Sequence, residues 1–285
     1  MITGTRYRMS AEVNRQANLA SQLARAQSDI STTVRLQSAS DDALSSARVS
    51  EIARMQAGGA VHKTNLESAA SQASQVDGTL KTVASAIDRA RELMLQGTSG
   101  TVNADDRKAL VTELRGIVAD LNAYRTQVDS RGQALFPETE ALQIPIATDV
   151  RVAATSSRAK VFESVDTDNG TLDLATIIGN AADALAMDVD ADRETAGQSA
   201  LADINAAVSH VAVVRADQGV RGARIDAVRE QLTSLATAQT EERSSLEDTD
   251  IGATVARVSA LQLSLEAAQA VFAKVNKSTL FDILG

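Results

Sequence analysis

The stretch IGATVARVSALQLSLEAAQAVFAKV, residues 251–275, decides the fold that we expect for this chain. Its apolar residues recur every three or four positions, which places them along one face of a helix. They are Ile251, Val255, Val258, Leu261, Leu265, Ala268, Phe272 and Val275. A spacing of this kind, kept over the whole stretch, is typical of a coiled coil, whose narrow apolar stripe requires a partner helix.

A matching stripe lies near the other end of the chain. Leu19, Leu23, Ala26, Ile30 and Val34 are also three or four residues apart, and polar residues flank them. Both ends of the chain therefore carry helices that need a partner. We expect the first helix to pair with the last in antiparallel orientation.

The composition agrees with a helical chain. Of its 285 residues, 44% are hydrophobic and only 2% are aromatic. The two prolines, Pro137 and Pro145, leave residues 1–136 and 146–285 without a helix breaker. We predict a mainly α protein, an elongated antiparallel helical bundle or coiled coil with paired N- and C-terminal helices and a small β-rich insertion.

The stretch before the prolines has two helix starts. After a break at residues 37–42, a helix is predicted to begin near Ala43, with Ser40 or Asp41 as its cap, and to reach about residue 96. Asn103 is the expected N-cap of the next helix.

The stretch around and after the prolines is less regular. Residues 150–152 and 160–162 predict short β-strands. The helical pattern returns near Leu172, pauses over the acidic residues 188–192, and continues in two further segments, one around residue 204 and one around residue 228.

Charge and hydropathy exclude several classes of protein. The formal net charge of −9 argues against a nucleic-acid-binding protein, which normally carries a basic stripe. No stretch approaches the roughly 20 apolar residues of a membrane span. The first residues, MITGTRYRMSAEVNRQ, lack the apolar run of a secretory signal peptide.

Residues that carry chemistry are scarce. The chain has no cysteine, and its two histidines, His62 and His210, lie far apart and are expected to be exposed helix residues. No phosphate-binding glycine loop, zinc-protease motif or serine-hydrolase motif is present. We therefore expect no cofactor, no metal ion, no catalytic residue and no enzymatic activity.

Several motifs resemble the bacterial flagellin family. LQSASDDA at residues 36–43 resembles the family's R-x-N-S-x-S-D-D-P/A segment, and the helix at residues 78–96 is similar to its G-x-L-x…R-x-R-E-L-x-x-Q pattern. RGQALF (131–136), LEDTD (246–250) and the tail FAKVNKSTLFDIL (272–284) resemble the family's branch at the hook-filament junction. Filament flagellins usually end differently. The resemblance covers about residues 1–136 and 200–285.

This resemblance implies a structural function. The chain would be an axial protein of the bacterial flagellum that polymerises through its terminal helices to form the hook-filament junction. Its partners would be other copies of itself in a helical homo-oligomer, the adjacent hook-associated protein, the filament flagellin and a flagellar export chaperone. It would be extracellular, exported by the flagellar type III route without a cleaved signal peptide.

The resemblance also implies a division of the chain into five segments. Residues 1–42 and 249–285 would be the two halves of an inner coiled-coil domain. Residues 43–136 and 172–248 would be the two parts of a helical rod domain. Residues 137–171 would form a small β-rich outer insertion.

Specific residues follow for assembly. The inner coiled coil is expected to use Leu19, Leu23, Ile30, Val34, Val255, Val258, Leu265, Phe272, Leu280, Phe281 and Leu284. Arg89, Arg91 and Glu92 are candidates for contacts between subunits in the rod layer. The alternative for these three is pairing on the surface of their own helix, for example between Asp88 and Arg91.

Two other interpretations stay open. A short or minor flagellin that forms the filament itself would share the architecture and differ in its tail. A cytoplasmic helical signalling rod, such as a chemoreceptor tail, is a remote alternative that also has heptads rich in Ala, Ser and Gln. Such a rod would not need the insertion that carries the prolines.

Overall fold

The computed structural model describes residues 2–99 and 102–284, and the side chains of residues 2–6, 8 and 275–284 lie outside this description. The helices are α1 (Ile2–Thr32), α2 (Ala43–Gly97), α3 (Ala104–Arg125), α4 (Leu174–Ala186), α5 (Asp190–Glu247) and α6 (Ile251–Leu284). The strands are β1 (Gln143–Ala147), β2 (Val150–Ala153), β3 (Val165–Thr167) and β4 (Gly170–Leu172). A mainly α fold with a small β-rich insertion is therefore confirmed.

The chain divides into two compact units. The terminal unit consists of Met1–Gln56 and Ala236–Gly285, and the central unit of Ala57–Leu235. Because α2 and α5 each contribute residues to both units, the division falls within helices and not at loops.

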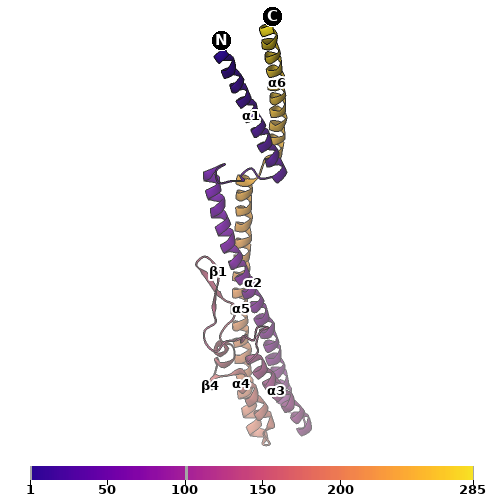
Figure 1. Cartoon of the computed structure of the whole chain (residues 1–285). Coiled ribbons are helices and arrows are strands. Elements are labelled where there is room, and N and C mark those ends of the chain that lie inside the picture. The colour runs from indigo at the N-terminus through magenta and orange to yellow at the C-terminus, as the bar shows by residue number, and fades with distance from the viewer. Residues whose placement is uncertain (1, 100–101, 285) are drawn as a thin grey trace. The chain divides into compact units, whose positions relative to one another are not determined.

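In the terminal unit, α1 packs against α6 in antiparallel orientation, with the two ends of the chain at the same end of the pair (Figure 1). The predicted pairing of the first helix with the last is confirmed. An ion pair also joins α2 to α5 in this unit, because Arg48 Nε lies 2.6 Å from Glu242 Oε1.

The start of α2 differs from the prediction in one residue. The helix begins at Ala43 as expected, but its cap is Asp42, whose carboxylate accepts hydrogen bonds from the Ser45 amide at 3.1 Å and the Ser45 hydroxyl at 2.6 Å. The expected caps, Ser40 and Asp41, lie two residues and one residue too early, respectively, to reach this amide. Asp41 has a different role, in the loop that precedes α2.

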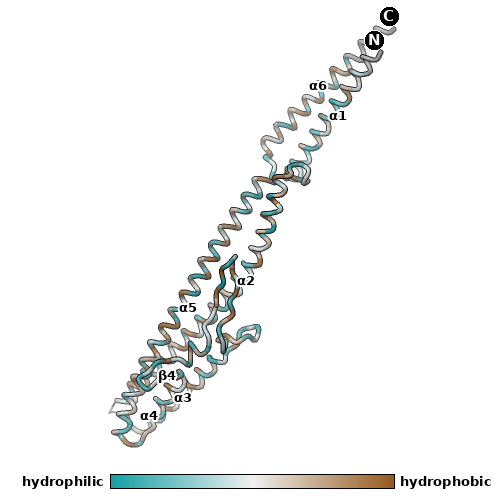
Figure 2. Tube along the Cα trace, turned by 90° about the vertical axis from the view of Figure 1, so that its left-hand side faces the viewer, coloured by the Kyte–Doolittle hydropathy of each residue, from teal (hydrophilic) through white to brown (hydrophobic). Residues whose placement is uncertain are grey.

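The core of the central unit is built by four helices. The buried apolar faces of α2, α3, α4 and α5 meet in one cluster, together with loop and insertion residues. Its large fully buried members include Leu80, Ile87, Leu93, Met94, Leu114, Leu121, Leu135, Phe136 and Phe162. Figure 2 shows hydrophobic segments (brown) recurring between hydrophilic ones (teal) along α5, as an amphipathic helix requires.

Local signals set the helix boundaries in this unit. Asn103 caps α3 as predicted, because its Oδ1 accepts hydrogen bonds from the amides of Asp105 at 3.0 Å and Asp106 at 2.8 Å. Asp173 caps α4 in the same way through the amide of Thr176.

Helix α5 is longer than the sequence pattern suggested. It begins at Asp190, inside the predicted acidic pause, and runs without a break to Glu247, where two segments were expected. Gly219 and Gly222 weaken such a helix by about 1 kcal/mol each. Burial of Val211 and Val214 before them and of Ile225 after them offsets this cost.

The insertion consists of two antiparallel hairpins, β1–β2 and β3–β4. The strand expected at residues 150–152 is β2, but the strand expected at residues 160–162 is wrong. These residues lie in a π-helical turn (Ala159–Glu163) that buries Val161 and Phe162. Phe162 contacts Phe136 edge to face, with ring centroids 5.1 Å apart, so packing overrides the local β-branched pattern.

Hairpin β1–β2 is held on the helices by a second, smaller cluster. Ile146 and Val152 of the hairpin pack with Leu66 and Ala69 of α2 and with Ile225 of α5. No helix in the described part of the chain is long and apolar enough to span a membrane.

The buried face of α3 gives a first prediction. Leu114→Ala should lower the free energy of unfolding by about 2–5 kcal/mol, because it leaves a cavity among close-packed side chains. Urea denaturation followed by tyrosine fluorescence measures the change, because Tyr124 packs on the same cluster and the other tyrosine, Tyr7, is exposed on α1.

The matched control is Leu95→Ala on α2, where the leucine is 50% exposed. This change should stay within about 0.5 kcal/mol of wild type. Equal losses in the two variants would contradict the assigned core.

Candidate assembly surface and helix joint

Helices α1 and α6 meet along one narrow seam. The least exposed side chains of each helix recur every three or four residues. On α1 they are Glu12, Gln16, Leu19, Leu23, Ala26 and Ile30, and on α6 they are Thr254, Val258, Leu261, Leu265, Ala268 and Phe272. Gln16 Nε2 donates to the Ala268 carbonyl at 3.4 Å, which joins the two helices across the seam.

The seam buries few side chains completely. Among the side chains described on these two helices, only Ala26 (4% exposed) and Ala268 (9%) are buried. The larger residues, such as Leu23 and Leu265, are half-buried. Two helices alone cannot surround a leucine, so the pair gains only part of the free energy that full burial would supply.

Most of the predicted inner residues lie on this seam, and two do not. Leu19, Leu23, Ile30, Val258, Leu265 and Phe272 are seam residues. Val255 is 48% exposed, because the heptad repeat runs back from Val258 to Thr254. Val34 follows the end of α1 at Thr32 and lies in a β-bridge with Asp248. The side chains of Leu280, Phe281 and Leu284 lie outside the described residues.

Helix α6 has a second apolar face, which sequence reasoning missed. Val255 (48%), Leu263 (68%) and Val271 (59%) are exposed away from the seam, and the alanines 256, 260, 267 and 270 are exposed as well. The sequence does contain an indication of this second apolar face, because residues 251–274 include only three charged side chains. A helix that is apolar on opposite faces is normally buried on both.

The loop between α1 and α2 (residues 33–42) is hydrogen-bonded to the loop between α5 and α6 (residues 248–250). We call these two loops and the residues that hold them the joint. The backbone amide of Arg35 donates to the Glu247 carbonyl at 2.7 Å, and that of Thr249 donates to the Thr33 carbonyl at 2.9 Å. Thr33 has φ of 58°, a left-handed conformation that is rare for a β-branched residue. The loop after α1 is therefore fixed directly to the loop before α6.

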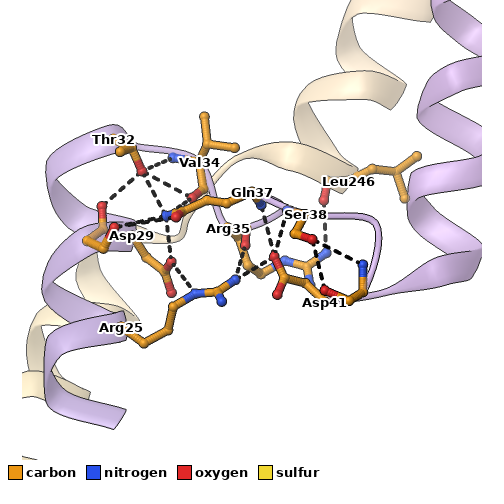
Figure 3. A network of polar contacts seen from close by, with 11 residues as sticks. Arg25, Asp29, Thr32, Val34, Arg35, Gln37, Ser38, Asp41 and Leu246 are labelled. Atoms are coloured by element: carbon orange, nitrogen blue, oxygen red, sulfur yellow. Dashed lines mark hydrogen bonds and ion pairs between the residues drawn. The ribbon is translucent and has the colours of Figure 1, made fainter. Parts of the chain in front are cut away.

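Arg25 and Gln37 make most of the polar contacts in this joint, and the Gln37 side-chain amide donates to Asp29 at 3.1 Å and to Thr32 at 3.2 Å (Figure 3). Arg25 makes the ionic contacts. Its guanidinium lies 2.6 Å from Asp41 and 3.1 Å from Asp29, and it donates to the Arg35 carbonyl at 3.3 Å. Asp41 also accepts hydrogen bonds from the amides of Gln37 at 3.1 Å and Ser38 at 2.8 Å. The loop is thereby folded back against the last turns of α1.

These contacts favour the ionised form of Asp41. The Arg25 guanidinium, followed by the Ser38 amide, holds the pKa of the Asp41 carboxyl below its usual range.

The predicted rod residues have a partner within the chain. Arg89 of α2 binds Glu113 of α3 through Nε at 2.7 Å, and its Nη1 lies 3.2 Å from Glu92. The Arg89 guanidinium lowers the pKa of Glu113. The alternative of pairing on the surface of their own helix is formed by Arg89 with Glu92, although not by the example pair of Asp88 with Arg91, and Arg91 is exposed. Arg89 thus joins α2 to α3, while a contact of these residues between subunits stays a prediction.

The histidines are not exposed as expected. Both are half-buried, and His210 Nε2 lies 3.1 Å from the Lys160 carbonyl, where it ties α5 to the insertion. Within residues 2–99 and 102–284, no three His, Cys, Asp or Glu side chains are grouped to hold a metal ion.

Family models account for both helical arms. The bacterial flagellin N-terminal helical region matches residues 5–141, and the bacterial flagellin C-terminal helical region matches residues 201–284. This chain belongs to the bacterial flagellin family. The two matches contain α1, α2, α3 and α6 and most of α5, and leave the hairpins and α4 of this flagellin-family chain between them.

Individual proteins that are similar to this chain include several flagellar hook-associated proteins. Flagellar hook-associated protein 3 of Escherichia coli (strain K12) is 24% identical over 287 residues, which cover 89% of this chain and 90% of the relative. The crystal structure of flagellar hook associated protein-3 from Legionella pneumophila has a TM-score of 0.64 and 12% identity over 70% of this chain and 98% of that one. The flagellar junction protein FlgL from Legionella pneumophila has a TM-score of 0.59 and 13% identity, covering 70% and 100%. These matches favour the junction branch of the family over the alternatives.

The joint gives a second prediction, on pH. Because the pKa of Asp41 is lowered on folding, its contribution to stability is fully present above about pH 4, the ordinary value. It should be lost as the pH falls through the lowered pKa. The amide NMR shift of Ser38, which donates to Asp41, should titrate with a midpoint below about 4.

Arg25→Ala is the matched variant. It removes the largest cause of the shift, so the midpoint should rise towards the ordinary value. A midpoint that is the same in wild type and variant would show that Arg25 does not hold this carboxylate.

Proposed function

We propose that this chain is a structural axial protein of the bacterial flagellum that polymerises through α1 and α6 to form the hook-filament junction. Membership of the flagellin family and the similarity to hook-associated protein 3 support this function. The role is one of assembly, and no catalytic activity is proposed.

The second apolar face of α6 is the observation that carries the proposal. Helix α1 covers only one face of α6, and Leu263 on the opposite face and Val271 on its flank are exposed in the single chain. A helical polymer repeats one contact between identical subunits, so it can cover this face on every copy except the last. Proteins that remain single chains in water rarely expose such an apolar face.

Folding of the terminal unit and polymerisation are coupled in this mechanism. The seam buries only Ala26 and Ala268 among its described residues, so α1 and α6 are weakly held in the free chain. A neighbouring subunit that covers the outer face of α6 would add the missing burial. The pair of α1 and α6 would therefore be only marginally stable before assembly and firmly held after it.

The predicted assembly residues keep distinct roles in this proposal. Leu19, Leu23, Ile30, Val258, Leu265 and Phe272 would hold α1 to α6. Val255 and Val271 would flank the outer face on its two sides, with Leu263 between them. Leu280, Phe281 and Leu284 would extend the contact to the tip. Arg91 and Glu92 remain candidates for contacts between central units, whereas Arg89 is engaged with Glu113.

The same function implies where each segment of the chain lies in the polymer, which proteins adjoin it and how it is exported. Residues 1–42 and 249–285 would form the inner domain of the polymer, residues 43–136 and 172–248 the rod domain around it, and residues 137–171 its outer surface. The neighbours along the axis would be another hook-associated protein and the filament flagellin. Export would use the flagellar type III route and a dedicated chaperone, and the protein would act outside the cell.

Location tests the junction role against a filament role. Antibody against residues 138–170 should label a narrow band where the hook meets the filament in isolated hook-filament preparations viewed by electron microscopy. Label along the whole filament would instead identify a filament flagellin. Absence of the protein from these preparations, with retention in the cytoplasmic fraction of the same cells, would identify a signalling rod.

Substitution of Leu263 tests the outer face. Leu263→Asp should reduce incorporation into the junction below detection, because an unpaired charge would have to be buried between subunits. Its helix content in the free chain should match wild type by circular dichroism, since the side chain is exposed there. Leu265→Asp, on the seam, should lose both incorporation and helix content.

Gln262→Asp is the matched control. It adds the same charge one residue away but replaces a polar, exposed side chain. It should assemble better than Leu263→Asp. Normal incorporation of Leu263→Asp would count against burial of this face in the polymer.

A further inference from the structure

The two connections of the terminal unit differ in length. α1 ends at Thr32 and α2 begins at Ala43, whereas α5 ends at Glu247 and α6 begins at Ile251. Fully extended, the longer connection could span about 33 Å. The connection between α1 and α2 is therefore long enough to let α1 slide along α6, unless this loop is held folded.

The seam alone defines the register of α1 against α6 weakly. Seam residues on both helices repeat every seven positions, so a shift by one heptad, about 10 Å, again places seam residues opposite seam residues. No large side chain described on the seam is fully buried, so little packing is lost in such a shift. Gln16 is a polar seam residue that donates to the Ala268 carbonyl, but a shift by one heptad presents it with another backbone carbonyl of α6, so this bond does not select one register.

The joint removes this ambiguity. The bonds from Arg35 to Glu247 and from Thr249 to Thr33 form only when the end of α1 lies beside the start of α6. They require a folded loop, and Asp41 closes that loop by accepting hydrogen bonds from the amides of Gln37 and Ser38. Arg25 attaches the closed loop to α1 by its ion pairs, and the Gln37 side chain adds hydrogen bonds to Asp29 and Thr32.

We propose that Arg25 and Asp41 are positioning residues that fix the heptad register of α1 against α6. An isolated surface ion pair would be too weak for this, but here one guanidinium holds Asp29, Asp41 and the Arg35 carbonyl together. The competing registers also differ little in packing, so a modest contribution decides between them. Resting on the proposed function, the register sets which part of α1 lies beside the outer face of α6 when the next subunit binds.

Disulfide formation reports the register directly, because the chain contains no cysteine of its own. In the native register Gln16 faces Ala268. If α1 moves one heptad away from the joint, Leu23 takes that place. The full-length variants Gln16→Cys with Ala268→Cys, and Leu23→Cys with Ala268→Cys, therefore report the native and the shifted register.

With the joint intact, oxidation should close the native pair, and the shifted pair should form about a tenth as much or less. Adding Arg25→Ala or Asp41→Ala should raise the shifted pair to an amount comparable with the native pair. Arg54→Ala, which removes the exposed ion pair with Glu51 on α2, is the matched control and should leave the ratio unchanged.

Two outcomes would overturn the proposal. In the first, the shifted pair stays at its low level in both joint variants, so the seam sets the register by itself. In the second, the native pair is lost without a gain of the shifted pair, so Arg25 and Asp41 only stabilise α1. The measurement uses the free chain, so its result does not depend on where the protein assembles.

Discussion

The packing of α1 along one face of α6 is the contact on which the rest of the terminal unit depends. It joins the two ends of the sequence, yet it buries only Ala26 and Ala268 completely among the side chains described there. A two-helix pair cannot enclose larger residues, so Leu263 on the far side of α6 and Val271 on its flank stay exposed. In a lone chain this incomplete burial leaves the pair of helices less stable. In a polymer the same exposed surface could be covered by another copy.

The central unit meets the opposite requirement. Four helices surround a shared core, and Arg89 and Glu113 join α2 to α3 at its surface. Hairpin β1–β2 is fixed by buried Ile146 and Val152, and the π-helical turn is fixed by the edge-to-face pair of Phe162 with Phe136. The central unit thus buries its apolar core within one chain, while the terminal unit leaves Leu263 and Val271 exposed. That contrast suits a protein that is built into a polymer by its ends.

The joint lies in the terminal unit, where helix pairing is weak. Arg25, Asp41 and the backbone bridge around Thr33 supply directional contacts where apolar packing supplies few. Hydrogen bonds depend on position and angle more than apolar contacts do, so they can select one register from several of similar packing. The polar contacts of the joint therefore select one arrangement of α1 and α6, and the apolar contacts of the seam stabilise it.

The sequence by itself determined the helical class, the start of α2 at Ala43, the cap at Asn103, the heptad stripes and the family. These features depend on residues close to one another along the chain. Only the tertiary structure decided that Thr254 replaces Val255 on the seam, that α1 stops before Val34, and that residues 160–162 coil to bury Phe162. Each of these depends on a partner far away in the sequence, and a local pattern does not specify which partner it meets.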